Sequence, residues 1–379
     1  MKYYIIAGEA SGDLHGSNLI RALKQVDPQA EVRCWGGDLM EKAGGVLVKH
    51  YKEMAFMGFF EVVMNLRTIF KNLDHCKQDI ETFQPDVIVC IDYSGFNLRI
   101  AKWAKSEGFR TQYYISPQVW ASRAGRVAKI KRDVEAMYVI LPFEEDFYKG
   151  HGYPVHFVGH PLIDAIAHLE KKPAAQFRER HQLHADQPII ALLPGSRKQE
   201  VDKMLTIMLS VAHDFKDHQF VIAGAPSLDA DFYRPFIKAS HVQFLENRTY
   251  ELLQHAHAAL VTSGTATLET ALFNVPQVVC YKANWLSYQI AKRIITLKYI
   301  SLVNLIMGRE VVKELIQAEL NKKNLSRELS RILDPEHRQT LSAAYVQLKE
   351  KLGGQGASKH TAERIYHSLK TPKDQEKPA

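Results

Sequence analysis

The sequence contains no long apolar segment, and this absence excludes a membrane-spanning helix. No run approaches the roughly 20 consecutive apolar residues that such a helix requires. The opening residues, Met1–Tyr3, lead directly into a strand-like segment and show no cleavage pattern, so we expect no signal peptide. Together these features predict a cytoplasmic protein.

Cysteine is also scarce, and its distribution gives no sign of a metal site. The four cysteines are dispersed over the 379 residues, at Cys34, Cys76, Cys90 and Cys280. The 17 histidines show no zinc spacing either. We therefore expect reduced thiols and no bound metal, in a chain whose length suits about two domains of roughly 150 residues each.

Acidic residues are outnumbered by basic ones, 42 against 49, which gives a formal net charge of +7. Such a balance suits anionic partners: nucleotides, phosphorylated lipids, a membrane surface or nucleic acid. Charge alone does not choose among these. The motifs described below favour a nucleotide and an anionic membrane surface, and we expect no nucleic-acid partner.

Short apolar segments alternate with amphipathic ones along both halves of the chain, as in parallel, doubly wound α/β sheets. In the first half the predicted strands are Tyr3–Ala7, Glu31–Trp35, Asp86–Ile91, Thr111–Ile115, Ala136–Leu141 and Val155–Val158. In the second half they are Ile189–Leu193, Phe220–Ala223, Val242–Phe244, Ala258–Val261 and Val278–Tyr281. Each half is therefore predicted to be a Rossmann-like domain, with the substrate site in the cleft between them.

The domain boundaries follow from this alternation and from a charged, proline-containing linker that ends near Gln187. We predict a first domain over residues 1–165, a second over 186–345, helices over 346–369 that pack back on the first domain, and a disordered tail over 370–379. The segment Ser301–Glu310 is expected to be a loop.

The strongest candidate for a phosphate site is the stretch Ile189–Leu205. An apolar strand ends at Leu193, Pro194–Ser196 form a turn, and an amphipathic helix follows. Backbone N–H groups at such a helix start point at an incoming anion, and Arg197 can add a forked contact to a phosphate. The alternative is an ordinary strand–helix turn with an exposed arginine.

A second candidate lies at Val261–Glu269. Ser263–Thr265 offer backbone donors and hydroxyls at a helix start, and Glu269 can accept hydrogen bonds from ribose hydroxyls. A plain helix cap is the alternative. Two anion sites in one domain suit a diphosphate. No acidic pair of the DxD type stands beside either loop to hold a metal ion.

Three carboxylates follow predicted strands of the first half, where open α/β sheets place ligands and catalytic groups. Glu9 and Asp13 lie in the loop Gly8–Asp13, and Asp92 follows the apolar strand Asp86–Ile91. The loop lacks the three-glycine spacing of a dinucleotide site, so NAD and FAD are not favoured. Asp13 and Asp92 could equally cap the helices that follow them.

The segment Met54–Phe70 is apolar on both sides of a predicted helix, unlike a solvated surface helix. It is too short to cross a bilayer, so it is either buried or in contact with lipid. The residues expected to contact acyl chains or the membrane are Phe56, Met57, Phe59, Phe60, Val63, Leu66 and Phe70. A basic helix predicted over residues 123–132 either faces solvent or binds the phosphate groups of lipids.

Eight motifs are spread in order over nearly the whole chain. They are Gly8–Asp13 (GEASGD), Met57–Val62 (MGFFEV), Ser116–Trp120 (SPQVW), Leu141–Phe143 (LPF), Gly159–Pro161 (GHP), Leu193–Arg197 (LPGSR), Ser263–Glu269 (SGTATLE) and Ser301–Glu310 (SLVNLIMGRE). With these motifs the chain resembles the lipid-A-disaccharide synthase family. The resemblance implies a metal-independent, inverting glycosyltransferase of GT-B type, built from two facing α/β domains with C-terminal helices.

The resemblance also implies the reaction and its site. UDP-2,3-diacylglucosamine would be joined to 2,3-diacylglucosamine 1-phosphate (lipid X), releasing UDP, at the inner face of the cytoplasmic membrane; a homodimer is allowed. No cofactor is implied, because the UDP-sugar is a substrate. The residues implied to hold UDP are Gly195, Ser196, Arg197, Glu200, Ser263, Gly264, Thr265, Ala266, Glu269 and Asn304.

This chain departs from many relatives at two positions. Gly95 replaces an aspartate that is a candidate base in the family, and Ser122 stands where relatives often carry tryptophan. The remaining candidates for the base are Asp92, Asp13 and Glu9. We favour Asp92, because it follows the most apolar strand of the first domain and desolvation raises a carboxylate's pKa.

Two other functions are compatible with parts of this pattern. A UDP-sugar epimerase, or another UDP-sugar transferase, could use the same scaffold without a lipid-facing segment. A basic module that binds membranes without catalysis would leave both phosphate loops unexplained.

Overall fold

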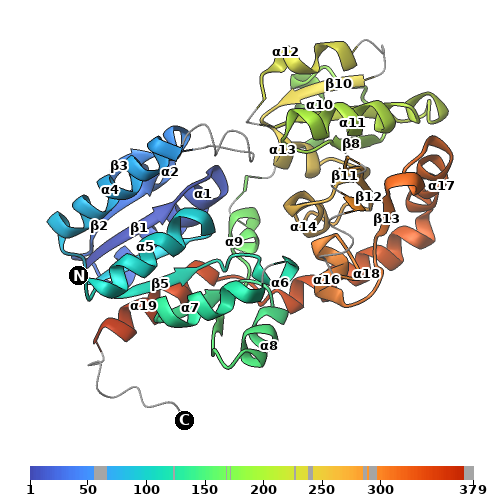
Figure 1. The fold of residues 1–379 in the computed structure, drawn as a ribbon. Helices are drawn as coiled ribbons and strands as arrows, with labels where there is room; N and C mark the ends of the chain where they lie inside the picture. The colour runs from blue at the N-terminus through green and yellow to red at the C-terminus, as the bar shows by residue number, and fades with distance from the viewer. Residues whose placement is uncertain are drawn as a thin grey trace. The chain divides into compact units, whose positions relative to one another are not determined.

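The computed structural model describes residues 1–54, 66–122, 124–167, 169–170, 172–225, 228–237, 242–284, 288–289 and 297–370. The chain forms two compact units, which are described separately (Figure 1). Unit 1 comprises Met1–Asp164 and Leu352–Ala379, and unit 2 comprises Ala165–Lys351. Among the described helices, none has the length and hydropathy needed to cross a bilayer.

Unit 1 is built on a seven-stranded sheet in the order β3-β2-β1-β4-β5-β6-β7, and all its strand pairs are parallel. The strands are β1 (Lys2–Ala7), β2 (Glu31–Gly36), β3 (Val46–His50), β4 (Val87–Ile91), β5 (Thr111–Tyr114), β6 (Ala136–Val139) and β7 (His156–Phe157). The helices are α1 (Ala10–Val26), α2 (Asp38–Lys42), α4 (Leu66–Phe83), α5 (Ser94–Ser106), α6 (Val119–Ser122), α7 (Val127–Asp133), α8 (Phe143–Gly150), α9 (Pro161–Ala167, which continues into unit 2) and α19 (Ala357–Lys370).

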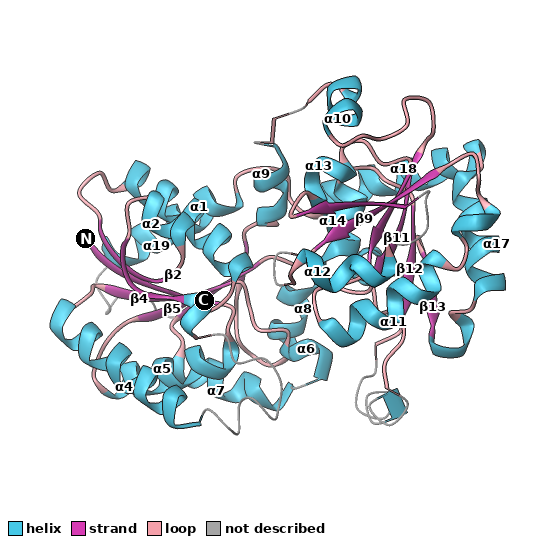
Figure 2. Ribbon diagram, turned by 90° about the horizontal axis from the view of Figure 1, so that it is seen from above, coloured by secondary structure: helices cyan, strands magenta, loops and turns pink. Residues whose placement is uncertain are grey.

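Unit 2 is built on a six-stranded parallel sheet in the order β10-β9-β8-β11-β12-β13. The strands are β8 (Ile189–Leu193), β9 (Gln219–Gly224), β10 (Val242–Glu246), β11 (Ala258–Thr262), β12 (Gln277–Tyr281) and β13 (Lys313–Ile316). The helices are α10 (Ala174–Arg180), α11 (Lys198–Leu209), α12 (Ala230–Tyr233), α13 (Thr249–Leu253), α14 (Thr265–Leu272), α16 (Leu302–Met307), α17 (Lys322–Leu333) and α18 (Pro335–Lys351). Helices cover both faces of this sheet (Figure 2).

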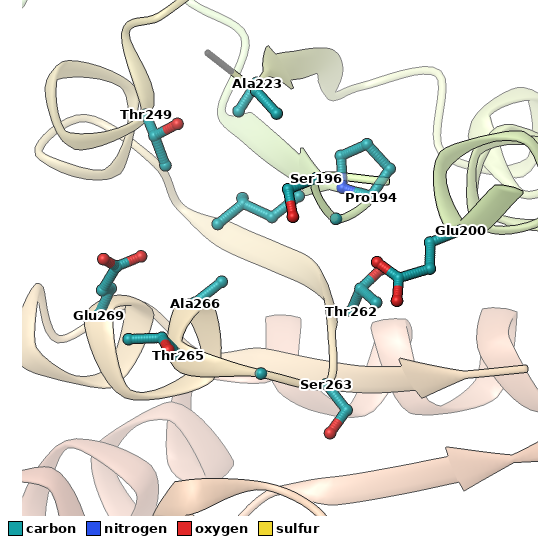
Figure 3. Close-up of a pocket in the computed structure, with 14 residues that line it drawn as sticks. Pro194, Ser196, Glu200, Ala223, Thr249, Thr262, Ser263, Thr265, Ala266 and Glu269 are labelled. Carbon is teal, nitrogen blue, oxygen red and sulfur yellow. The ribbon is translucent and has the colours of Figure 1, made fainter. Parts of the chain in front are cut away.

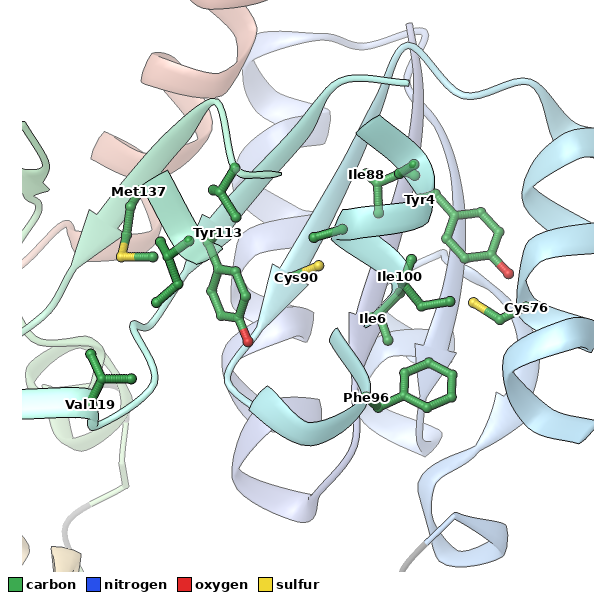
Figure 4. Packing of buried hydrophobic residues seen from close by; sticks show 14 of the residues in the cluster. Tyr4, Ile6, Cys76, Ile88, Cys90, Phe96, Ile100, Tyr113, Val119 and Met137 are labelled. Carbon is green, nitrogen blue, oxygen red and sulfur yellow. The ribbon is translucent and has the colours of Figure 1, made fainter. Parts of the chain in front are cut away.

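The central strands are apolar because both faces of each sheet are covered. Along β1, Tyr4 and Ile6 join one buried cluster, together with residues of α4, α5 and α7 (Figure 4). The intervening Tyr3, Ile5 and Ala7 join a second cluster with α1 and α19. Successive side chains of a strand point to opposite faces, so β1 is buried on both. The predicted fold class, two Rossmann-like parallel-sheet domains with helices, is confirmed.

Each sheet has one point where the strand order reverses. This point lies between β1 and β4 in unit 1, and between β8 and β11 in unit 2. The loops that leave two such strands run to opposite faces of the sheet and open a crevice at its carboxyl edge, where α/β proteins bind ligands. The fold therefore provides one candidate site in each unit.

Two strands were not predicted, and both are edge strands. β3 is only partly buried, and β13 carries Lys313 and Glu314, so neither has the continuous apolar run of a central strand. Ser301–Glu310 was predicted to be a loop but contains α16, whose first turn is capped by the Ser301 hydroxyl.

The chain returns to unit 1 at Leu352, later than the predicted boundary at residue 346. The reason is that α18 continues unbroken to Lys351 and packs on α14, α16 and α17 of unit 2. From Leu352 onward, the His160 N–H donates to the Leu352 carbonyl (3.0 Å), and α19 packs against α1. Of the tail predicted over residues 370–379, Lys370 is the last residue of α19, and residues 371–379 lie outside the described residues.

Asp13 is a structural carboxylate, contrary to its prediction as a catalytic candidate. It is 3% exposed and accepts hydrogen bonds from three backbone amides, those of Gly37 (2.8 Å), Leu39 (3.2 Å) and Met40 (3.0 Å). These amides lie at the start of α2, so Asp13 on α1 caps a different helix.

We predict that Asp13→Ala destabilises the protein by about 1–3 kcal/mol, because three amides lose their acceptor in a buried place. Thermal unfolding should then begin several degrees lower. Glu9→Ala is the control, because Glu9 stands at the amino end of α1 and makes no capping hydrogen bond among the described residues. Equal melting temperatures for the two variants would contradict this assignment.

Candidate active site

The candidate site of unit 2 is a cavity of about 290 Å³ at the point where the strand order reverses (Figure 3). Its walls come from the carboxyl ends of β8, β9 and β11 and from the first turns of α11, α13 and α14. The lining residues are Leu193, Pro194, Gly195, Ser196, Glu200, Ala223, Ala225, Thr249, Thr262, Ser263, Gly264, Thr265, Ala266 and Glu269.

Two helices begin at this cavity, after turns that contain glycine. Gly195 has φ +104°, and a Cβ there would come within 3.1 Å of Glu200 Oε2, so only glycine fits without strain. Gly264 precedes α14 with φ +155°. The first amides of α11 and α14 have no partner within their own helices, and both helix dipoles present their positive ends. Such an arrangement favours a bound anion, and two together favour a diphosphate.

Glu269 supplies a carboxylate to the same cavity. Its Oε1 accepts a hydrogen bond from the Tyr250 hydroxyl (2.7 Å), and burial raises the pKa of Glu269. The remaining acceptor positions of the carboxylate can receive ribose hydroxyls. Ser263 has a different role, because its hydroxyl donates to the Ile300 carbonyl (2.9 Å) and so ties the loop to the segment before α16.

Eight of the ten residues predicted to hold UDP line this cavity: Gly195, Ser196, Glu200, Ser263, Gly264, Thr265, Ala266 and Glu269. Arg197 does not line it. Its exposed guanidinium lies at the amino end of α11, with Nη1 3.6 Å from Glu200 Oε1. Arg197 is therefore adjacent to the cavity, and its ion pair with Glu200 is exposed to solvent.

The structure does not place Asn304 at the cavity. Asn304 is fully buried, and its Oδ1 accepts the Val311 and Val312 amides at 2.7 and 3.0 Å. Its Nδ2 donates to the Val312 carbonyl (2.8 Å) and to Glu314 Oε1 (2.9 Å). These bonds use the full capacity of the side-chain amide. Asn304 therefore holds the turn between α16 and β13.

Sequence reasoning missed the lining residues Ala223, Ala225 and Thr249. They come from the end of β9 and the start of α13. Ala223 and Ala225 reach the cavity because β9 lies beside β8 in the sheet, and strand order is not visible in a single sequence. Thr249 reaches it from the first residue of α13.

The candidate site of unit 1 centres on Asp92, directly after β4. Asp92 and Tyr93 both have left-handed backbone conformations, with φ +41° and +46°. The Asp92 N–H donates to the Ile115 carbonyl (3.3 Å), and its own carbonyl accepts from Asn97 Nδ2 (2.8 Å) and from the Tyr113 hydroxyl. A sparsely populated conformation held by three partners is a common feature of functional sites.

Burial, with a smaller contribution from the Glu9 carboxylate, raises the pKa of Asp92 to about 6. A hydrogen bond from the Tyr93 amide opposes the rise. Although neighbouring groups surround its carboxyl, Asp92 is a solvent-exposed residue, so a substrate can reach it. The Glu9 carboxylate thus affects Asp92 electrostatically at the point where the strand order of unit 1 reverses. Asp13, by contrast, is hydrogen-bonded to the first amides of α2.

Gly95, one of the two positions where the sequence departs from the expected pattern, borders open space. It is the second residue of α5, and a Cβ there would meet no described atom within 4 Å. Among the described residues, therefore, no neighbour requires glycine here. The described residues contain no group of three or more histidine, cysteine or carboxylate side chains that could hold a metal.

The predicted lipid-facing segment is only partly described. Phe56, Met57, Phe59, Phe60 and Val63 lie outside the described residues, and so does the side chain of Leu66. Phe70, on the second turn of α4, is 55% exposed. It is one of few large apolar side chains that the described surface exposes to this extent.

Comparisons with known proteins agree on the family. The family model described as lipid-A-disaccharide synthetase matches residues 3–366. The chain is 40% identical to lipid-A-disaccharide synthase of Geobacter metallireducens over 373 residues, which are 96% of each chain. It is 39% identical to that of Syntrophus aciditrophicus, covering 94% of this chain and 95% of the relative.

The fold is shared more widely. UDP-GlcNAc 2-epimerase of Neisseria meningitidis, solved with UDP-GlcNAc bound, superposes with a TM-score of 0.71. The superposition covers 97% of this chain and 100% of the epimerase at 13% identity, so it shows a common fold and leaves the reaction open. The sequence match over nearly the whole length decides between these families. The chain belongs to the lipid-A-disaccharide synthetase family and is a glycosyltransferase of lipid A disaccharide synthesis.

Proposed function

We propose that the chain transfers 2,3-diacylglucosamine from UDP to a hydroxyl of 2,3-diacylglucosamine 1-phosphate, with inversion at the anomeric carbon. The observation that carries this proposal is the cavity of unit 2, where two helix amino ends and the carboxylate of Glu269 border one space. The helix ends suit the diphosphate, and Glu269 suits the ribose. Membership of the family supports a UDP-sugar donor and an acceptor of lipid A synthesis.

The departure of UDP needs stabilisation of a developing negative charge. The amino ends of α11 and α14 supply preorganised amides and positive dipole ends for this purpose. Arg197 can turn from Glu200 toward the diphosphate, because its present ion pair is exposed and therefore weak. We propose that these groups replace a metal ion and that no cofactor takes part.

The acceptor hydroxyl needs a base on the opposite side of the anomeric carbon. We propose that Asp92 is this base. Its raised pKa makes it a better proton acceptor than an ordinary carboxylate, and its backbone is held by Ile115, Asn97 and Tyr113. Glu9 is the nearest alternative, because it is exposed at the same edge of the sheet.

We predict that Arg197→Ala weakens UDP binding by roughly 1.5–3 kcal/mol, the range for losing a charged hydrogen bond. Calorimetric titration with UDP in the presence of EDTA measures this and tests the metal-free proposal at once. Arg234→Ala is the matched control, since Arg234 is equally exposed and pairs with Asp231 (2.8 Å) with the same sequence spacing. If Arg197→Ala binds UDP with unchanged affinity, Arg197 is not part of the UDP site. If EDTA abolishes UDP binding and magnesium restores it, the proposal of metal independence is refuted.

We predict that Asp92→Asn lowers kcat by ~10²–10⁴ while UDP affinity is retained, because asparagine keeps the size but not the basicity. In the parent enzyme kcat should fall as the pH drops through about 6, where Asp92 takes up a proton. Glu9→Gln removes a negative neighbour, so this acid limb should move to lower pH. A loss below about tenfold in Asp92→Asn, with a large loss in Glu9→Gln, would transfer the role to Glu9.

We propose further that residues 54–70 attach the protein to the anionic inner face of the cytoplasmic membrane. Two observations support this proposal: the sequence of the segment places apolar residues on both sides of a predicted helix, and Phe70, its last residue, is an exposed apolar side chain on α4. The net charge of +7 adds attraction to anionic lipid.

We predict that Phe70→Glu, and more strongly the double variant Phe59→Glu with Phe60→Glu, reduces sedimentation with anionic vesicles while UDP binding is retained. A carboxylate at such a position opposes both apolar insertion and the negative surface. Val346→Glu is the control, because Val346 on α18 is 58% exposed but belongs to unit 2. Loss of folding in the double variant, with full vesicle binding in Phe70→Glu, would mean that the segment is core.

A further inference from the structure

Unit 1 contains a buried carboxylate that the proposed reaction does not use. Glu144 lies in the first turn of α8 and is 1% exposed. Its Oε2 accepts the amides of Leu141 (2.9 Å) and Ile140 (3.2 Å), the two residues that follow β6. Burial raises the pKa of Glu144 to about 7. A neutral side chain at this position would lose less solvation free energy on burial than an ionised carboxylate does.

The surroundings of Glu144 come from the SPQVW motif, which has no other assigned role. The Ser116 side chain lowers the pKa of the Glu144 carboxyl. The Ser116 hydroxyl also forms a hydrogen bond with the Tyr148 hydroxyl (2.6 Å). The indole N–H of Trp120 is buried and has no hydrogen-bond partner among the described residues. Glu144 and Tyr148, both on α8, therefore connect the ends of two strands: Glu144 accepts the amides that follow β6, and Tyr148 forms a hydrogen bond with Ser116, just beyond β5.

Ile115 connects this cluster to Asp92. It precedes Ser116 and has φ +64°, a conformation that a β-branched residue adopts only under constraint. This conformation aims its amide at the Tyr138 carbonyl (3.0 Å), on β6, and its carbonyl at the Asp92 amide (3.3 Å). The groups that fix Ser116 therefore also fix the acceptor of the Asp92 N–H.

We propose that Glu144 is a positioning residue for the transfer reaction: with Ser116 and Tyr148 it holds Ile115 in its strained conformation and, through Ile115, fixes Asp92. This inference rests on the proposed role of Asp92. Glu144 does not touch substrate in this scheme. Its contribution reaches the reaction only through the backbone of Ile115 and the carboxylate of Asp92.

The test is a double-mutant cycle on kcat. Glu144→Gln keeps the side-chain size and one acceptor oxygen but weakens the cluster, and we expect kcat to fall about tenfold or more with UDP affinity unchanged. In the Asp92→Asn background the same substitution should cost no further activity, because residues that act as one unit are not additive. Tyr148→Phe leaves the carboxylate in place and should give a smaller loss with the same coupling.

The matched control is Asp27→Asn. Asp27 is also a buried carboxylate of unit 1, and it accepts from the amino terminus (2.9 Å) and from the Tyr3 hydroxyl (3.1 Å), beside the first residue of β1. This is the edge of the sheet opposite to Asp92. We expect Asp27→Asn to lower the melting temperature while kcat of the folded enzyme stays unchanged.

Three outcomes overturn the inference: unchanged kcat in both Glu144→Gln and Tyr148→Phe, losses that multiply with that of Asp92→Asn, or an equal loss of kcat in Asp27→Asn. If Glu144→Gln does not fold, the cycle with Tyr148→Phe gives the decision. Full activity in Asp92→Asn is a separate result, because it refutes Asp92 as the base whatever the Glu144 variants do, and with it the route from Glu144 through Asp92.

Discussion

The parallel arrangement of the strands is the constraint on which both candidate sites depend. Every strand in a parallel sheet delivers its carboxyl end to the same edge, and every following helix begins there. In unit 2 this brings the ends of β8 and β11 together with the amino ends of α11 and α14. In unit 1 it brings Glu9, after β1, to the same edge as Asp92, after β4.

The two sites use this edge in different ways. The site of unit 2 relies on backbone groups, since glycine turns expose amides beside the partly buried acid Glu269. The site of unit 1 relies on a single carboxylate whose backbone is held by side chains of α5 and β5. The first suits a ligand whose charge is already present, the diphosphate. The second suits a group that must change its protonation state during the reaction.

Sequence patterns predicted the features that depend on local composition. The buried runs of β1, β4, β8 and β11 and the turns around Gly195 and Gly264 follow from residues close together in the chain. The features that were missed depend on distant contacts or weak patterns.

Asp13 was predicted to act in catalysis or to cap its own helix because nothing in the sequence relates it to the start of α2. Asn304 was assigned to UDP from a motif, although its partners lie seven to ten residues further on. The edge strands β3 and β13 lack the apolar signal that buried strands carry.

The return of the chain to unit 1 at Leu352 has a consequence for biosynthesis. Asp164 accepts the Gly356 amide (2.6 Å) across 192 residues of sequence, and α19 supplies Ala362 and Ile365 to the core beside α1. A ribosome must therefore synthesise all of unit 2 before the first unit can complete its core. During that interval the apolar face of α1 and β1 that α19 covers is open, and unit 2, which is continuous in sequence, can fold first. The half that is synthesised first is thus the half that finishes folding last.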